Sequence, residues 1–257
     1  MSLRLSTGLR DQMLKYGSLA RIMSNCVLKV YTGAQPANAD AAPTGTLLCT
    51  YSNAGGALTR EVLSTGSVAL TGGGSGSVNT LTVNGIEIMG SVTNFNTSLT
   101  QTAADIATKI NNNPQNWLYQ ASNNGGATVT ITAKPGLGAL PNAWTVASTV
   151  TTITKTDTNM SGGVTAVNGL NWQTVSAAVL SKDSNTWQGT AGNTGTAGWF
   201  RIEAAVSDGG GADSTESIFR IDGAVATSGA ELNMGSTSIV SATIQTISSF
   251  TITLPTA

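Results

Sequence analysis

Carboxylates are the side chains of this sequence with the widest range of possible chemistry, because the chain contains no histidine. A Ser-His-Asp or Cys-His site is therefore excluded, and so is a zinc site that needs imidazole. Two carboxylates could still hydrolyse a glycosidic bond. Glu87 and Asp105 are the close-set acids of the central part of the chain. A hairpin and a helix cap explain them better, so we expect no catalytic residue and no enzymatic activity.

A second acidic group lies in the glycine-rich stretch "SDGGGADSTE", which contains Asp208, Asp213 and Glu216. The spacing of these acids does not match an EF-hand loop. A solvated loop and a weak calcium site both fit the stretch, and the solvated loop is the simpler interpretation.

Other motifs that could hold a ligand are weak. The stretch "TGGGSGS" at 71–77 has the glycine content of a phosphate loop but lacks the Gly-Lys-Ser/Thr ending and a following helix. Trp172, Trp187 and Trp199 fit a packed core, with a sugar platform or an interface anchor as the alternative. No alternation of basic and aromatic residues suggests nucleic-acid binding. We therefore expect no cofactor and no resident metal.

Composition limits the class of protein. Of the 257 residues, 40% are hydrophobic and 10% are charged, and the net charge is −1. Such a chain folds, and it has no broad electrostatic attraction to nucleic acid or to a membrane. Residues 1–11 contain no apolar segment typical of a secretory signal, and no run approaches the length of a membrane span. A virion protein, made in the host cytoplasm and released by lysis, would combine this hydroxyl-rich composition with the lack of a secretion signal.

Cys26 and Cys49 lie beside or inside predicted strands. Two reduced, buried thiols are the simpler interpretation. A disulfide requires the two strands to pair, and a chain made in the cytosol gives it little support.

The first thirty residues predict a short helical arm. Leu5, Leu9, Met13 and Tyr16 recur at helical spacing, Ser6 or Thr7 can cap the helix, and Gly17 can end it. A second short turn follows from residue 18 to 23. These thirty residues carry a net charge of +4, from five basic residues and one acid. The charge fits either a solvated helix face or an arm that docks on an acidic neighbour.

Strands are predicted at 27–31 and 47–51, joined by a stiff connection. Pro36 and Pro43 fix φ in this connection, and Gly33 and Gly45 allow tight turns. After residue 164, further short strands are predicted at 170–172, 177–180, 186–188 and 198–207. Short strands separated by turn residues are typical of an antiparallel β-sandwich.

The segment at 63–164 differs in sequence pattern from the segments before and after it. It contains short strands at 67–70, 81–83 and 86–89, with an Asn84-Gly85 hairpin turn between the last two. A helix follows, with Thr102 as its expected cap, and then strands at 117–121, 127–133 and 144–154. We predict a mainly β fold: a sandwich from 1–62 and 165–257 with an N-terminal helix, and a small inserted β-β-α-β-β domain at 63–164.

The outer segments resemble a family of tailed-bacteriophage virion proteins. The resemblance is carried by "MSLRLSTGLRDQML", "LKVYTGAQPANADAAPTGTLL", "TAGWFRI", "IDGAVATSGAELNM" and the ending near "TITLP". The inserted segment is similar to small modules of other phage tail and surface proteins. The family implies a non-enzymatic collar, neck or decoration protein near the head-tail junction, with no catalytic motif.

The resemblance and the basic arm together suggest where such a protein makes contacts. We expect a homo-oligomer that packs on portal, connector, capsid or tail proteins in the virion. A decoration or tail protein that binds host glycan through the inserted domain is the alternative. The expected assembly contacts are Leu5, Leu9, Arg10, Met13 and Arg21 of the arm, with Gln35 and Pro36 of the connection.

Overall fold

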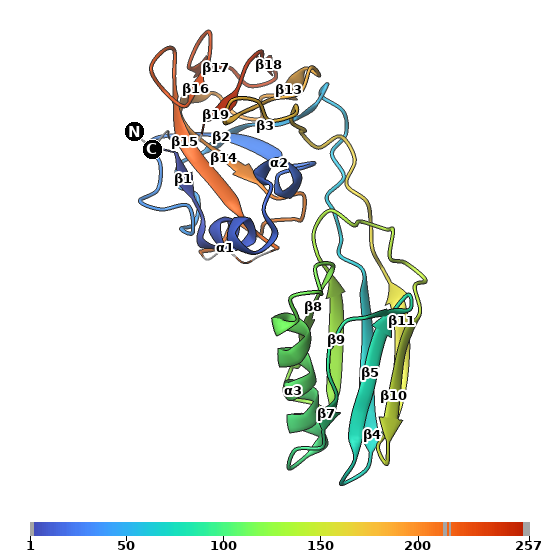
Figure 1. The fold of residues 1–257 in the computed structure, drawn as a ribbon. Coiled ribbons are helices and arrows are strands. Elements are labelled where there is room, and N and C mark those ends of the chain that lie inside the picture. The colour runs from blue at the N-terminus through green and yellow to red at the C-terminus, as the bar shows by residue number, and fades with distance from the viewer. Residues whose placement is uncertain (1–2, 213–214, 216, 254–257) are drawn as a thin grey trace. The chain divides into compact units, whose positions relative to one another are not determined.

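A computed structural model describes residues 3–212, 215 and 217–253. It divides into two compact units (Figure 1): Met1–Glu61 with Ala166–Ala257, and Val62–Thr165. The predicted boundaries, 63 and 164, lie one residue inside the limits of the second unit. The predicted mainly β, antiparallel fold with few helices is confirmed. In the described part of the chain, no helix is long and apolar enough to cross a membrane.

The first unit begins with β1 (Arg4–Leu5), α1 (Thr7–Tyr16) and α2 (Leu19–Ile22). Ser6 caps α1 by accepting a hydrogen bond from the Leu9 N–H, and Gly17 ends the helix with φ of 87°. Both ends agree with the sequence prediction. Leu5 differs from it, because this residue pairs with Ile221 as a strand instead of opening the helix. The side chain of Tyr16 lies outside the description.

One twisted sheet organises the first unit. Its strands are ordered β1-β15-β14-β2-β3-β13-β18, and two shorter strands pair with β15 and β14. A separate pair, β12 (Val179–Ser181) and β19 (Thr251–Thr253), lies off this sheet. The strands of the main sheet are β2 (Val27–Thr32), β3 (Leu47–Asn53), β13 (Trp187–Thr190), β14 (Gly195–Glu203), β15 (Arg220–Ala226), β16 (Leu232–Asn233), β17 (Ser238–Ile239) and β18 (Ile244–Ile247).

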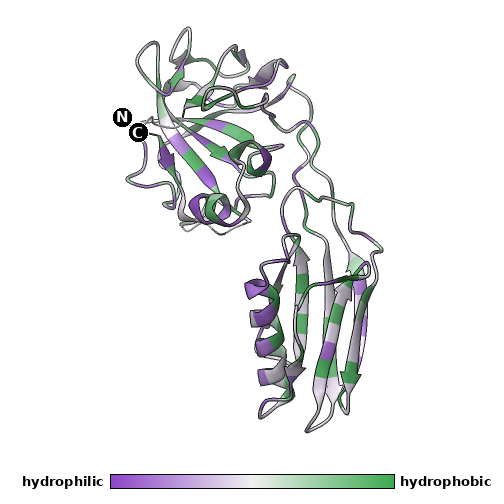
Figure 2. Ribbon diagram, viewed as in Figure 1, coloured by the Kyte–Doolittle hydropathy of each residue, from purple (hydrophilic) through white to green (hydrophobic). Residues whose placement is uncertain are grey.

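The two faces of this sheet differ in chemistry. Leu28, Phe200, Ile202 and Ile221 point to one side and join a buried apolar core. Their neighbours along the same strands point to the other side, as period-2 alternation requires. In Figure 2, hydrophilic and hydrophobic residues accordingly alternate at the start of β15. The second face carries most of the charged residues of the central strands.

The tryptophans and cysteines of this unit are buried or half-buried, as the sequence predicts. Trp187 and Trp199 are fully buried, and Trp172 packs half-buried against the core with its ring 5.2 Å from that of Trp187. Cys26 and Cys49 are free and buried. Burial raises the pKa of Cys26 to about 12 and that of Cys49 to about 11, so neither thiol is a nucleophile at neutral pH.

The second unit consists of one helix and two antiparallel sheets, ordered β10-β5-β6, with β7 also on β5, and β11-β4-β9-β8. The apolar face of the helix joins both sheets in one core. The elements are β4 (Thr65–Gly72), β5 (Ser77–Val83), β6 (Ile86–Glu87), β7 (Thr93–Asn94), α3 (Leu99–Asn112), β8 (Tyr119–Ser122), β9 (Thr128–Ala133), β10 (Val146–Thr151) and β11 (Thr154–Ser161).

Two predictions for this unit are wrong in detail. Ser98, not Thr102, caps α3, because the Ser98 hydroxyl accepts from the Gln101 N–H at 3.1 Å. Thr102 is buried inside the helix and accepts from the Asn96 N–H. The single strand expected at 144–154 is two strands, since the chain turns between β10 and β11 at Thr152, where φ is 64°. The Asn84-Gly85 turn forms as predicted, with φ of 52° and 78°.

Candidate functional site

The acids considered for chemistry have structural partners. Glu87 accepts hydrogen bonds from the backbone N–H groups of Leu81, Met89 and Gly90, and so closes its own hairpin. Hydrogen bonds from two neighbouring amide side chains lower the pKa of Asp105 and fix it beside the start of α3. Each carboxylate therefore holds groups of its own segment.

Of the three acids in the glycine-rich stretch, the structure describes Asp208 alone. Asp208 is buried, with 1% of its side chain exposed, and it is paired with Arg220. The solvated-loop interpretation is therefore wrong for Asp208. Asp213 and Glu216 lie outside the described residues. Within the part that is described, no group of three acidic or cysteine ligands is arranged to hold a metal ion.

The charged face of the sheet in the first unit carries a buried ion-pair network. Arg201 on β14 and Asp222 on β15 are directly opposite each other and fully buried. The guanidinium donates from Nε to one carboxylate oxygen and from Nη2 to the other, both at 2.7 Å. This two-pronged geometry is the strongest form of an Arg–carboxylate contact.

A second pair extends the network along β15. Arg220 donates from Nε and Nη2 to Asp208 at 2.6 and 2.9 Å. At the same end of β14, Glu203 contacts Lys29 and Arg60, each at 2.7 Å. The buried charges are therefore paired, as their removal from water requires.

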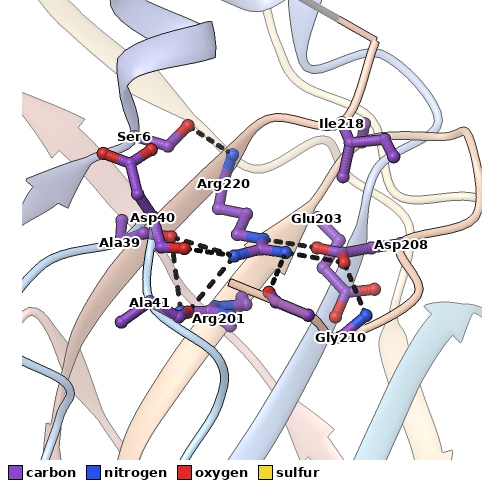
Figure 3. A network of polar contacts seen from close by, with 12 residues as sticks. Ser6, Ala39, Asp40, Ala41, Arg201, Glu203, Asp208, Gly210, Ile218 and Arg220 are labelled. Atoms are coloured by element: carbon purple, nitrogen blue, oxygen red, sulfur yellow. Dashed lines mark hydrogen bonds and ion pairs between the residues drawn. The ribbon is translucent and has the colours of Figure 1, made fainter. Parts of the chain in front are cut away.

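The two arginines also hold the connection between β2 and β3, and we name residues 33–46 the strap. Arg201 Nη2 donates to the Ala41 carbonyl at 3.0 Å, and Arg220 Nη1 donates to the Asp40 carbonyl at 3.0 Å (Figure 3). Further along the strap, Trp199 Nε1 donates to the Thr44 carbonyl at 3.2 Å. These contacts fix the backbone of the strap against the sheet and leave its exposed side chains facing outward.

The strap is also joined to the N-terminal arm. The Asp40 carboxylate accepts from both the N–H and the hydroxyl of Thr7, each at 2.8 Å, at the first residue of α1. Arg4 donates to the Pro36 carbonyl, and Arg10 donates to the Thr7 hydroxyl at 3.0 Å. An acidic group at a helix N-terminus is favourable, because unpaired N–H groups gather there. The arm and the strap therefore form one continuous surface.

The electrostatics of the network differ between its two acids. Burial raises the pKa of Asp208, but the hydrogen bond and the charge of Arg220 outweigh that effect and leave the pKa lowered. Burial is the larger influence on Asp222, whose pKa is raised despite the contact with Arg201. The same pairing with Asp208 raises the pKa of Arg220 against the opposite effect of burial. The charged hydrogen bonds of these groups hold the strap.

The predicted assembly residues are divided by the structure. Leu9 is fully buried in the core and Pro36 is a buried residue of the strap, so neither side chain faces a partner, contrary to the prediction. Leu5 and Met13 are half-buried against the core. Of the remaining residues, Arg10 and Arg21 are exposed, and Gln35 is half-buried with an amide group that lacks a hydrogen-bond partner.

Sequence reasoning missed other members of this surface. Leu14 is 86% exposed on the outer face of α1, beside Arg10 and Asp11. Its position outside the repeat of Leu9 and Met13 is the signal that could have identified it. One basic residue of the first thirty, Lys29, forms an ion pair with Glu203 of the same chain, so its charge is already neutralised.

Comparisons with known proteins identify no relative: no family model matches the chain, and neither a curated protein nor a solved structure matches it. The candidate site therefore rests on its own geometry.

Proposed function

We propose that this chain is a non-enzymatic structural protein of a bacteriophage virion. In this proposal it is a collar or neck component at the head-tail junction that contacts neighbouring virion proteins. The contact surface is the outer face of α1 together with the strap. The fixing of the strap backbone by Arg201 and Arg220 is the observation that carries the proposal. A surface held in this way loses little conformational entropy when a partner binds.

The composition of the strap supports an assembly role. It is uncharged except for Asp40, whose carboxylate is already bonded to Thr7. A partner can therefore cover the strap without burying a carboxylate that lacks hydrogen-bond donors. Leu14 adds an exposed apolar side chain, and Arg10 and Arg21 add basic groups for an acidic neighbour.

The resemblance to phage virion proteins is consistent with this surface. Four of the sequence motifs that carry it include residues of α1, the strap, β14 and β15, which are the elements joined by the ion-pair network, and the fifth, "TITLP", begins on β19. Most of the resembling residues therefore lie on elements that the network connects.

The test is incorporation of surface variants into particles. We expect Arg10→Glu combined with Leu14→Asp to keep the purified chain folded and to reduce its copy number on virions at least about tenfold, an effect of roughly 1.4 kcal/mol or more. Gln115→Glu, an exposed change in the second unit, is the matched control and is expected to incorporate normally. Normal incorporation of the double variant would contradict the assembly surface.

A second candidate function rests on the second unit. Trp117 is 68% exposed, on a loop fixed by Asn116, whose amide bonds to the backbone of Tyr119 and of Ile110. An exposed indole on a loop whose backbone is held in this way suits stacking against a sugar ring, so this unit could bind host surface glycan. Saturable binding of the full chain to host polysaccharide, lost in Trp117→Ala and kept in Leu140→Ala, would support this candidate. Absence of binding by the unmodified chain would remove it.

A further inference from the structure

The edge strand of one sheet in the second unit is closed by side chains. Tyr119 and Ala121 on β8 direct their backbone groups away from β9. The Asn116 amide accepts from the Tyr119 N–H at 3.2 Å and donates to the Tyr119 carbonyl at 3.0 Å. Asn111 makes the same two contacts with Ala121, both at 2.8 Å. Each amide takes the place of a peptide group in a neighbouring strand, so this edge is blocked to further pairing.

The edge strand β18 in the first unit is not closed in this way. The Ala191 N–H donates to the Thr243 carbonyl at 2.9 Å at the start of the contact between β13 and β18. Because bonding alternates along an antiparallel ladder, Gln245 also faces β13, and Ile244 and Thr246 direct their N–H and C=O groups outward. Among residues 3–212, 215 and 217–253, these outward groups have no partner strand.

The side chains of β18 favour pairing as well. Ile244 is 63% exposed and Thr246 is exposed beside it, and both are β-branched residues that suit a sheet. The strand contains no proline and no charged residue, and no charged residue occurs anywhere from 232 to 257. The charges, prolines and bulges with which proteins commonly protect an edge are therefore missing from β18.

We propose that β18 pairs with β18 of a second copy of this chain, antiparallel, about a two-fold axis at Gln245. In this register Ile244 exchanges both backbone hydrogen bonds with the partner's Thr246, and Thr246 does so with the partner's Ile244. A strand presented to its own copy about a two-fold axis is self-complementary. The uncharged segment brings no like charges opposite each other, which would oppose pairing.

A second copy is the occupant that the charge pattern favours. An arbitrary strand could satisfy the backbone, but a second β18 ensures that both sides are uncharged and present the same β-branched residues. The pairing does not depend on the proposed virion role. A strand of four residues covers little area, so we expect a weak dimer, with a dissociation constant on the order of 100 µM.

The test is sedimentation equilibrium of the full chain over a concentration series that spans this value. Thr246→Pro removes an outward N–H and leaves the groups that bond to β13 in place. We expect this variant to stay folded by circular dichroism and to dimerise at least about tenfold more weakly. Thr246→Ala keeps the N–H and is the matched control, expected to dimerise like the unmodified chain.

A charge pair tests the register and covers the case in which Thr246→Pro fails to fold. Ile244→Asp and Thr246→Lys should each weaken the dimer when introduced alone. The double variant should recover dimerisation, because each new aspartate then lies opposite a lysine of the partner in the proposed register only. A monomeric unmodified chain at every concentration, or an oligomer insensitive to these changes, would overturn the proposal.

Discussion

The two units of the molecule satisfy their buried polar groups in different ways. The first unit places charged residues inside, on one face of its sheet, and pairs Arg201 with Asp222 and Arg220 with Asp208. The second unit has an apolar core and covers strand backbone with short side chains such as Asn111 and Asn116. The first arrangement fixes a surface loop, and the second closes the unit on itself.

This difference indicates what each unit is built to do. Ion pairs are expensive to bury, and an apolar replacement of similar volume often stabilises a fold equally well or better. The arginines of the first unit do something that an apolar side chain cannot, because Arg201 Nη2 and Arg220 Nη1 also donate to carbonyls of the strap. We therefore connect the charged face with presentation of the strap, and the apolar unit with an independent role.

The largest expected effect is from removing one member of the central pair. Asp222→Ala leaves the Arg201 guanidinium buried without its counter-charge, so we expect unfolding of the first unit to become easier by about 4 kcal/mol. Hydrogen exchange followed by mass spectrometry should show lost protection in β14, β15 and the strap, with the second unit unchanged. Equal loss in both units would break the comparison.

A smaller effect is expected from the amide that closes β8. Asn116→Ala leaves the Tyr119 backbone uncovered and removes the contact with the Ile110 carbonyl, so we expect a loss of about 2 kcal/mol in the second unit. Urea unfolding followed by the same exchange measurement would locate the loss. Gln115→Ala, in the same loop and exposed, is the control with little expected effect.

Much of the local structure could be predicted from the sequence because its signals are local. Helix α1 begins after Ser6 and ends at Gly17 as expected, and the Asn84-Gly85 turn forms. The two changes of sequence pattern near 62 and 165 coincide with the limits of the second unit. Each of these depends on residues within a few positions of one another.

The ion-pair network and the strand β11 could not be predicted in this way. Arg201 contacts the strap at Ala41, 160 positions away along the chain, and residue types alone do not identify such partners. The sequence "TKTDTNMS" of β11 shows no apolar alternation, because Met160 is its one buried residue. The basic charge of the arm predicts Leu9 as a contact residue, but Leu9 lies in the core, since an apolar helical stripe fits a core and an interface equally well.

The contact between Asp40 of the strap and Thr7 of the arm is a weaker interaction of the first unit. Asp40→Ala removes both contacts to Thr7, and loss of such a cap costs about 1 kcal/mol. We expect faster exchange at the start of α1 and in the strap, with β14 and β15 still protected. Loss of protection throughout the sheet would mean that the strap supports the fold and is not merely held by it.

The smallest effect is the pH dependence of the two network acids. The folded-state pKa of Asp208 is lowered, so its contribution to stability is present above the ordinary value of 3.8 and is lost as the pH falls through the folded value. The folded-state pKa of Asp222 is raised, so its contribution to stability is present below 3.8 and is lost as the pH rises through the folded value. Carboxyl chemical shifts measured by NMR should show midpoints on opposite sides of 3.8. Coincident midpoints would contradict the assignment.

The most direct test of the central claim is cryo-electron microscopy of virions from cells that express this chain. The proposal predicts density for the first unit in a ring between portal and tail, with the outer face of α1 and the strap against a neighbouring protein. Density at the tail tip, with the second unit outermost, would favour host recognition instead. Virions without any density for the chain would contradict a structural role in the particle.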